Sequence, residues 1–461
     1  MLGTYDPYMP VKKLRELKPT MEILQSKQKP RKLRLESEDG EIKTFILKSK
    51  EDLKQDERTM QLFSLVNSLL ANDKIESHKN LSIQRYSITP LSSGKRNAVG
   101  LIGWANNCTT FHTLVKLYRE NCERRDVGYE TTYNGRYLIS SQFFEKLQAQ
   151  SQLHDTEESI RLAFLAKASS LQTLAMFMNT RRMSSGSDLA HILRLKSVTC
   201  DTWLERRTNY TRSLAVTSMV GYILGLGDRH PSNIMLNEKS GKIVHIDFGD
   251  CFELSFCRPS YPEKIPFRLT RMMVKAVEIT GVRGTYRNTC INVLKILRKN
   301  QNTLKSLLSA FIHDPLSVWQ DESMAKSNTR PNENQNDEDQ WSPENSEFSE
   351  EEEYDKLEEF DPLTYGRGFT FTAPTRHSYK KSFMQHWDGL NKKQEDSNKR
   401  EDWVADSKIK RVQQKLTGRD DIIERGDGRV MTVEEQVDAL IEEATDPENL
   451  SSLFSGWCAF W

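Results

Sequence analysis

A short stretch in the middle of the chain holds the side chains that phosphoryl transfer requires. Asp228 and Asn233 lie five positions apart in GDRHPSN (227–233), and Asp247 opens DFGD (247–250) shortly afterwards. Transfer of a phosphoryl group needs a carboxylate beside the attacking hydroxyl and side-chain oxygens that hold Mg²⁺ on the phosphates. These residue types therefore indicate a site that moves phosphate with the help of a divalent cation.

The spacing adds to the residue types. Protein-kinase catalytic loops place an Asp and an Asn at the same separation, and the Asp of D-F-G follows. The usual order His-Arg-Asp is reversed here, because His230 comes after Asp228. The alternative is a turn-forming Asp, a helix-capping Asn and a chance D-F-G. The combined spacing, the hairpin pattern between the two motifs and an upstream Lys favour phosphoryl transfer.

An upstream Lys should contact the phosphate oxygens, and Lys48 ends the strand-like run TFILK. Acids that could hold it follow at the start of the next helical pattern, among them Glu51 and Asp56. A solvated Lys at a strand edge is the alternative. No G-x-G-x-x-G loop is present, and residues 23–33 with Ser26 occupy its expected place, although a plain basic turn would also fit.

The elements that position these residues follow from periodicity. Residues 32–48 read as a hairpin around Asp39-Gly40, with further strands at 80–91 and 98–105 and a helix at 51–73. From residue 107 the pattern is mostly helical, notably at 203–226 and 268–313, with a short hairpin around 239–241. Acidic residues dominate 321–362, which predicts a disordered segment.

Composition excludes several classes. A chain of 461 residues with 37% hydrophobic residues can build two or three domains, and a net charge of +1 gives no field for nucleic acid. Seven Cys without a C-x-x-C pair argue against a disulfide framework or a zinc module and favour a reducing compartment. We find no signal peptide pattern and no apolar run long enough for a membrane span, and we expect a soluble protein.

Several stretches together resemble the phosphatidylinositol-3-kinase-related protein kinases, and within them the target-of-rapamycin (TOR) branch. They include LGLGDRHPSNIML, HIDFGDCFE, EDLKQDERTMQLF, YPEKIPFRLTRM, KLTGRD and the terminal ATDPENLSSLFSGWCAFW, which resembles the FATC element. The resemblance implies an α+β, two-lobed PI3K/PI4K-like kinase fold. It assigns 1–106 to a small β-rich N-lobe with the hinge, 107–320 to a larger, mostly helical C-lobe, 321–405 to a disordered regulatory insertion, 406–428 to a C-lobe helix and 429–461 to FATC.

The resemblance also implies roles for single residues. Asp228 would orient or deprotonate the substrate hydroxyl, and His230 would stabilise the transferring phosphoryl group. Asn233 and Asp247 would ligate Mg²⁺ (or Mn²⁺). The residues that would bind ATP are Lys48, its supporting acids Glu51 and Asp56, Ser26 over the phosphates, Trp104 and Ala105 at the adenine, and Ile23, Ile46, Tyr86, Met235 and Ile246 along an apolar pocket. Ordinary core packing is the alternative for the apolar members.

Partners and location come from the resemblance as well. It implies protein substrates in growth and nutrient signalling, scaffold proteins of a TOR complex, and a small WD-repeat subunit bound at 121–185, a segment that matches the family poorly. It implies no nucleic-acid partner and a cytoplasmic protein that can associate peripherally with endomembranes.

The substrate class has to be argued from the site, because lipid kinases share this fold. A polyphosphorylated lipid needs basic side chains in the loop after Asp247. That loop, 250–266, offers only Arg258 and Lys264 and also carries three acids. We therefore expect a non-specific serine/threonine protein kinase. The alternatives are a phosphatidylinositol 3- or 4-kinase and a catalytically inactive scaffold.

The C-terminal unit opens with a capping box, Thr432 and Glu435, followed by an amphipathic helical pattern over 432–444. We expect this helix to brace the activation loop, although any packing helix would show the same pattern. Trp457, Phe460 and Trp461 could meet a membrane interface, and burial against the C-lobe is the favoured interpretation.

Overall fold

The computed structural model describes residues 13–24, 29–49, 51–73, 80–92, 98–124, 170–182, 185–258, 261–312, 397–420 and 429–461. They all belong to one compact unit, which comprises residues 1–317 and 396–461. A second unit, 318–395, lies outside the described residues, as do Ser26 and most of 121–185. The predictions for these segments therefore stay predictions.

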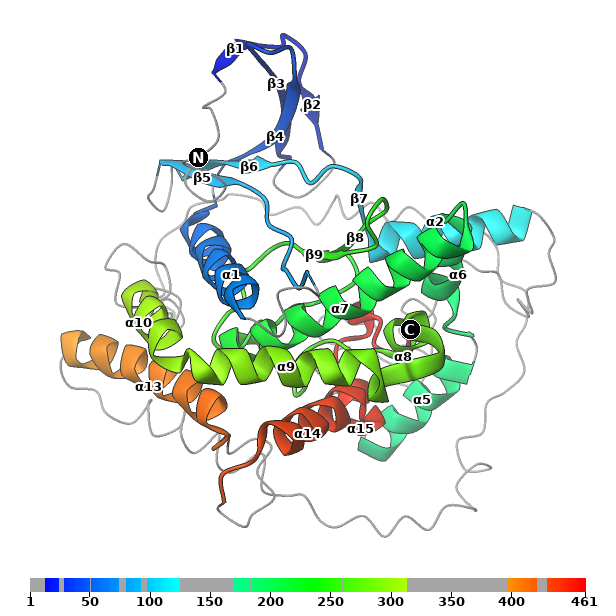
Figure 1. Ribbon diagram of the computed structural model, residues 1–461, viewed down its shortest axis with the longest axis vertical. Coiled ribbons are helices and arrows are strands. Elements are labelled where there is room, and N and C mark those ends of the chain that lie inside the picture. Colours follow the sequence, from blue (N-terminus) through cyan, green and yellow to red (C-terminus); the bar gives the residue numbers. More distant parts are fainter. Residues whose placement is uncertain are drawn as a thin grey trace, which may run out of the picture. The chain divides into compact units, whose positions relative to one another are not determined.

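The N-terminal part is a six-stranded antiparallel sheet with one helix beside it (Figure 1). The strand order is β1-β3-β4-β6-β5, and β2 pairs with β3. The predicted hairpin is confirmed, with Gly40 in the left-handed region at φ 80°. The strands are β1 Leu14–Leu17, β2 Glu22–Ile23, β3 Arg31–Ser37, β4 Ile42–Ser49, β5 Ile88–Ser92 and β6 Val99–Gly103, and the helix is α1 Lys54–Asn72.

The C-terminal part is mostly helical and is built around α7, Cys200–Leu224. A capping box between Thr199 and Thr202 begins this helix, and Gly225 at φ 65° ends it. Its second half is buried throughout, because it packs against α9 on one side and β9 on another (Figure 1). The three-stranded sheet β7 Cys108–Thr110, β8 Ile234–Asn237 and β9 Ile243–His245 contains the second predicted hairpin.

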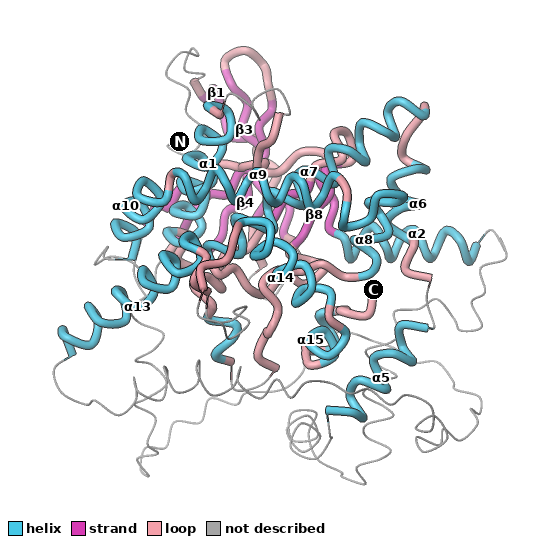
Figure 2. Tube along the Cα trace, turned by 60° about the horizontal axis from the view of Figure 1, so that its bottom comes forward, coloured by secondary structure: helices cyan, strands magenta, loops and turns pink. Residues whose placement is uncertain are grey.

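The remaining helices lie around α7 and include those of the C-terminal unit (Figure 2). Helix α14 packs on α9, and α15 contacts both α14 and α5. The remaining helices with their bounds are α2 Phe111–Arg124, α5 Ser170–Arg182, α6 Asp188–Leu195, η2 Leu254–Cys257, α8 Arg271–Val277, η3 Glu278–Arg283, α9 Thr285–Lys299, α10 Gln301–Ile312, α13 Ser397–Thr417, α14 Val433–Thr445, α15 Pro447–Ser451 and η5 Ser455–Trp457.

The predicted division into a small β-rich part and a larger helical part is confirmed, with three differences in detail. The strand expected at 80–91 begins only at Ile88. The helical region 268–313 is broken into separate helices, because Glu278 and Gly284 leave the helical conformation, as does Gly281 within η3. The helix expected from 406 already begins at Ser397 and ends at Thr417. Each difference lies at an element boundary, where local pattern is the weakest guide.

The C-terminal helix follows its sequence pattern closely. Helix α14 begins after Thr432, whose side chain accepts from the Glu435 amide at 3.2 Å while Glu435 reaches back to the Thr432 amide. Val437, Leu440 and Ala444 are buried, as the amphipathic pattern predicts. Trp457, Phe460 and Trp461 are buried too, which confirms packing as the fate of these aromatic rings.

Candidate functional site

Two loops bring the predicted chemistry together. The first, 225–233, connects the end of α7 to β8, and the second, 246–251, follows β9. Asp228 and Asp247 both adopt left-handed backbone conformations, with φ of 55° and 60°. Such conformations are uncommon for residues other than Gly and occur preferentially at functional sites.

The side chain of Asn233 ties the first loop together. Its amide nitrogen donates to the Asp228 carbonyl oxygen at 3.0 Å, and the backbone carbonyl oxygen of Asn233 accepts from the Ile246 amide at 3.1 Å. Asn233 is only 7% exposed. Because the side-chain nitrogen is engaged as a donor, the side-chain oxygen is the atom that can serve as a metal ligand.

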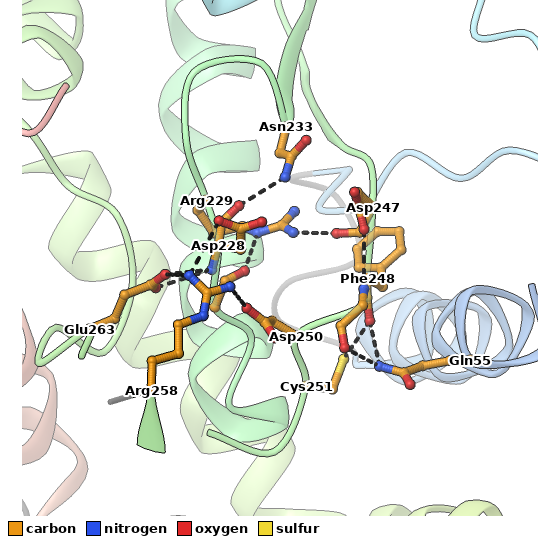
Figure 3. Close-up of polar contacts among 12 residues, drawn as sticks. Gln55, Asp228, Arg229, Asn233, Asp247, Phe248, Asp250, Cys251, Arg258 and Glu263 are labelled. Atoms are coloured by element: carbon orange, nitrogen blue, oxygen red, sulfur yellow. Dashed lines mark hydrogen bonds and ion pairs between the residues drawn. The ribbon is translucent and has the colours of Figure 1, made fainter. Parts of the chain in front are cut away.

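Asp247 lies just beyond the end of β9, where its carboxylate is exposed. Its Oδ1 accepts the Gly249 amide at 3.2 Å. Figure 3 shows Asp247 and Asn233 at the same end of the site, above the Arg229 guanidinium. A carboxylate and an amide oxygen are the hard ligands that Mg²⁺ takes from proteins, so this donor set fits the predicted cation.

Arg229 is a residue whose role the sequence patterns did not suggest. It is 3% exposed, and its guanidinium donates to the carbonyl oxygens of Gly227 at 2.7 Å, Ile246 at 2.8 Å and Asp247 (Figure 3). It therefore joins the loop of Asp228 to the loop of Asp247. Its place between an acid and a His in the motif was the only available signal.

Two side chains of helix α1 form hydrogen bonds with the backbone of the second loop. Gln55 donates to the carbonyl oxygens of Phe248 at 2.6 Å and Gly249 at 2.9 Å, and Asp56 accepts the Phe248 amide at 3.0 Å. Burial, with the nearby Asp247 carboxylate, raises the pKa of Asp56 to about 7. Gln55 was not singled out in the sequence, since its role depends entirely on a distant backbone.

Lys48 lies near the end of β4 and forms an ion pair with Glu51, whose Oε2 is 3.0 Å from its Nζ. Asp56, predicted as a second support for Lys48, takes the Phe248 amide as its hydrogen-bond partner instead. The charge of Lys48 still acts on Asp56, because it partly opposes the rise in the pKa of that carboxyl. Of the two predicted acids, Glu51 is the one that contacts the Lys.

His230 is half-buried beside Asp228. Its Nδ1 accepts the Ser232 amide at 3.2 Å, which leaves Nε2 as the nitrogen that can carry the proton of a neutral ring. Burial lowers the pKa of His230, and the neighbouring Asp228 carboxylate only partly opposes this effect. The ring is therefore a neutral hydrogen-bond donor at neutral pH.

The residues predicted for the adenine pocket differ in their burial and in their contacts. Tyr86 is buried, and burial, with Asp56 nearby, raises the pKa of its hydroxyl well above the usual range. The amide of Trp104 donates to the Thr44 carbonyl oxygen at 3.0 Å, and Lys32 lies over its ring at 4.3 Å. The others lie on or beside strands: Ile23 on β2, mostly exposed, Ile46 on β4, Ala105 after β6, Met235 on β8 and Ile246 after β9.

A cluster of three carboxylates surrounds Arg258 on the other side of Asp228. The Arg258 Nη1 atom is 3.8 Å from Asp228 Oδ1 and 3.5 Å from Glu263 Oε1, and Nη2 pairs with Asp250 (Figure 3). The three carboxylates have oxygen atoms within 4.8 Å of one another, which is close enough to bind a cation. The guanidinium supplies that cation. We name this group the Arg258 cluster.

Comparison with known protein families shows which families have sequences like that of this chain. The family model described as phosphatidylinositol 3- and 4-kinase matches residues 42–321, more than half of the chain. The chain belongs to the phosphatidylinositol 3- and 4-kinase family. The FATC domain model matches residues 430–461, so the family domain is followed here by the predicted C-terminal element.

Relatives narrow the comparison within this kinase family. The chain is 40% identical to the serine/threonine-protein kinase TOR of Oryza sativa subsp. japonica and 39% identical to the serine/threonine-protein kinase mTor of Drosophila melanogaster. Both alignments cover 100% of the chain but only 17% and 16% of the relatives. The chain thus spans about a sixth of the length of the curated relatives that it matches.

A solved structure supports the fold. The FAT and kinase domain of CtTel1 superimposes with a TM-score of 0.64 over 98% of this chain and 24% of that chain, at 24% sequence identity. The predicted two-lobed PI3K/PI4K-like kinase fold is therefore confirmed. Among the helices in the described ranges, none is long and apolar enough to cross a bilayer.

Proposed function

We propose that the chain is the catalytic part of an ATP-dependent serine/threonine protein kinase of the TOR type. Its relatives at about 40% identity carry that name, and the described site contains the side chains that phosphoryl transfer needs. Growth and nutrient signalling, scaffold and WD-repeat partners, the domain boundaries and a cytoplasmic location belong to the same proposal.

The roles proposed for the loop residues are those that the family resemblance implies, and their positions are compatible with them. Asp228 orients the substrate hydroxyl and accepts its proton, and neutral His230 donates to the transferring phosphoryl group. Asn233 and Asp247 would hold Mg²⁺ or Mn²⁺, and the cation would neutralise charge on the phosphates of ATP. Arg229 keeps the two loops in register through its three carbonyl contacts.

The roles of the nucleotide residues are proposed from their positions. Lys48, held by Glu51, contacts the ATP phosphates. Trp104 and Ala105, directly after β6, meet the adenine, and Tyr86 lies deepest, close to Asp56 and Asp247. Ile23, Ile46, Met235 and Ile246 complete the apolar wall, and Ser26 covers the phosphates.

The ion pairs of Arg258 are the observation that favours a protein substrate over a lipid substrate. A phosphorylated inositol headgroup needs basic side chains that are available to its phosphates. Arg258 is already surrounded by three carboxylates, so the cluster as a whole repels an anionic headgroup. Lys264 is exposed but is the only other basic residue that 250–258 and 261–266 provide. An uncharged hydroxyl on a peptide meets no such repulsion at Asp228.

A parallel assay of two substrates tests the proposal. The protein is incubated with ATP and Mg²⁺ and either a serine/threonine peptide library or phosphatidylinositol vesicles. We expect phosphate transfer to peptide and not to lipid, and Asp247→Ala should reduce that transfer by at least about 100-fold. Lys264→Ala is the matched control and should keep the wild-type rate. Turnover of lipid without peptide, or unchanged turnover in Asp247→Ala, would overturn the proposal.

A further inference from the structure

The backbone at Asp228 needs a partner that holds it in place. Its φ of 55° is a left-handed conformation, which costs a residue other than Gly roughly 1 kcal/mol or more. Asn233 donates to the Asp228 carbonyl oxygen, so the carbonyl of this residue is bound within its own loop. The amide of Asp228 has to be bound from elsewhere.

That partner is Glu263, far along the segment that follows DFGD. The Asp228 amide donates to both carboxylate oxygens of Glu263, at 3.0 and 3.1 Å (Figure 3). Glu263 is 5% exposed, so water does not compete for this contact. A carboxylate that accepts a backbone amide forms a stronger hydrogen bond than a neutral acceptor would.

The segment that carries Glu263 is itself attached to the Asp228 loop. Within that segment the amide of Glu263 donates to the Ser255 carbonyl oxygen at 3.1 Å, and between segment and loop the amide of Gly227 donates to the Asp250 carbonyl oxygen at 2.9 Å. A β-carbon at Gly227 would collide with the Ser255 side chain, so the approach depends on a Gly there. The segment and the loop therefore approach each other closely at Gly227, directly beside the Glu263 contact.

Glu263 interacts with the charges of Arg258, Asp228 and Asp250, and also with the buried guanidiniums of Arg229 and Arg268. Arg258 lies 3.5 Å away and favours the ionised form, whereas Asp228 and Asp250 oppose it. Burial is the largest influence and raises the pKa of Glu263 to about 7. Arg258 also lies near the Asp228 carboxylate, so one cation links the acid that meets the substrate and the acid that holds its backbone.

We propose that Glu263 is the positioning residue for Asp228, holding the amide of that residue so that its carboxylate faces the substrate hydroxyl. This inference rests on the proposed kinase function and identifies how the segment after DFGD acts on the reaction. When Glu263 is removed, the amide loses its acceptor and the left-handed turn relaxes. The Asp228 carboxylate then leaves its aligned position, while the nucleotide residues on β4 and directly after β6 are untouched.

Three variants test this. In Glu263→Ala the amide has no acceptor, and we expect kcat to fall by roughly 10- to 100-fold. Glu263→Gln keeps a side-chain oxygen for the amide and should recover most of that loss. The Lys264→Ala control removes an exposed side chain from the next position and should leave kcat unchanged. The KM for ATP and the affinity for a fluorescent ATP analogue should stay within about two-fold in all three variants.

A second readout does not depend on turnover. Hydrogen exchange at the Asp228 amide should accelerate in Glu263→Ala and stay close to wild type in Glu263→Gln and Lys264→Ala. If Glu263→Ala fails to fold, Glu263→Asp takes its place, because shortening by one methylene withdraws the acceptor but keeps the charge. Loss of kcat is expected there too.

Two results would overturn the inference: wild-type kcat and exchange in the folded Ala or Asp variant, or equal losses of kcat in the Gln and Ala variants together with weaker nucleotide binding. The second pattern would mean a general structural role. Failure of the proposed function looks different. The wild-type protein would then transfer no phosphate to peptide, while the exchange experiment would still report whether Glu263 holds the Asp228 amide.

Discussion

At the scale of single residues, Asp56 changes its expected task. Its type and position suggested an acid that supports Lys48, but its carboxyl accepts the amide of Phe248, next to Asp247. Phe248 is fully buried and packs edge-on against Phe63 of α1, with ring centroids 5.4 Å apart. Asp56 therefore holds the backbone of the second loop against α1.

This assignment predicts a difference between two substitutions. Asp56→Ala leaves a buried amide without an acceptor, and the free energy of unfolding should fall by about 1–3 kcal/mol. Asp56→Asn keeps the acceptor oxygen, and a pKa of about 7 means that the site already accepts an uncharged side chain near neutral pH. The free energy of unfolding of Asp56→Asn should therefore fall by less than about 1 kcal/mol. Urea unfolding of both variants checks this, and equal losses would argue against the hydrogen bond as the main role.

At the scale of elements, a buried charged network joins the C-terminal helices to the segment after DFGD. Glu253 accepts Arg411 at 3.0 Å and Lys415 at 2.7 Å, both from α13. Arg411 also pairs with Asp420 at 2.6 Å, and Gln436 of α14 donates to the Lys415 carbonyl oxygen at 2.9 Å. The ion pairs to the segment after DFGD come from α13, and α14, the helix expected to brace that segment, contacts α13. This network stabilises the packing of the three elements.

The network predicts a dependence of stability on pH. Burial alone would raise the pKa of Glu253, but Lys415 and Arg411 outweigh it and hold the value at about 2, below the ordinary 4.5. The ionised form therefore stabilises the fold above pH 4.5, and this contribution is lost as the pH falls towards 2. Glu253→Gln should lower the free energy of unfolding by about 3 kcal/mol at neutral pH. The difference in the free energy of unfolding between Glu253→Gln and the wild type should become smaller below pH 4.5.

An exposed ion pair provides the control for that measurement. Glu434 of α14 pairs with Lys295 of α9 at 2.6 Å, but both side chains are about half exposed. Glu434→Gln should change the free energy of unfolding by less than about 0.5 kcal/mol, because solvent screens such pairs. A loss at Glu434 as large as the loss at Glu253 would show that burial does not set the strength of the network.

At the scale of the whole molecule, the last residues of the chain reach the catalytic loop through one side chain. Arg268 donates to the carbonyl oxygens of Trp457 and of Cys458, the latter at 3.1 Å, and to that of Arg229 at 3.4 Å. Arg271 donates to the Phe460 carbonyl oxygen at 3.2 Å. The C-terminal segment thus holds Arg268 against the residue that joins the two site loops.

Deletion of 450–461 should therefore abolish phosphate transfer, because it removes two of the three acceptors of Arg268 and uncovers buried aromatic surface. Arg268→Lys separates the two effects. A single ammonium cannot reach the carbonyls from both segments, so kcat should fall by about ten-fold while the protein stays folded. Arg283→Lys, on an exposed Arg, should leave kcat unchanged. A truncated protein that keeps its turnover would show that the C-terminal segment is dispensable.

The sequence by itself determined the features that depend on a local pattern of residues. The hairpin at Gly40, the capping box of α14 and the buried stripe of α14 all depend on neighbours within a few residues, and their signals are present in the chain. The motif residues Asp228, Asn233 and Asp247 were recognised in the same way, since their types and spacing suit phosphoryl transfer. Boundaries such as the start of α13 at Ser397 were misplaced, because helix ends have weak local signals.

Only the tertiary structure decided which distant side chains act on these motifs. Gln55 bonds a backbone 193 positions away, Glu263 bonds the Asp228 amide from 35 positions away, and Arg268 reaches Trp457 across 189. Such pairings depend on how α1, the segment after DFGD and the C-terminal unit pack together. Their polar groups find partners because burial makes an unpaired group costly, and burial is a property of the assembled fold rather than of any stretch of sequence.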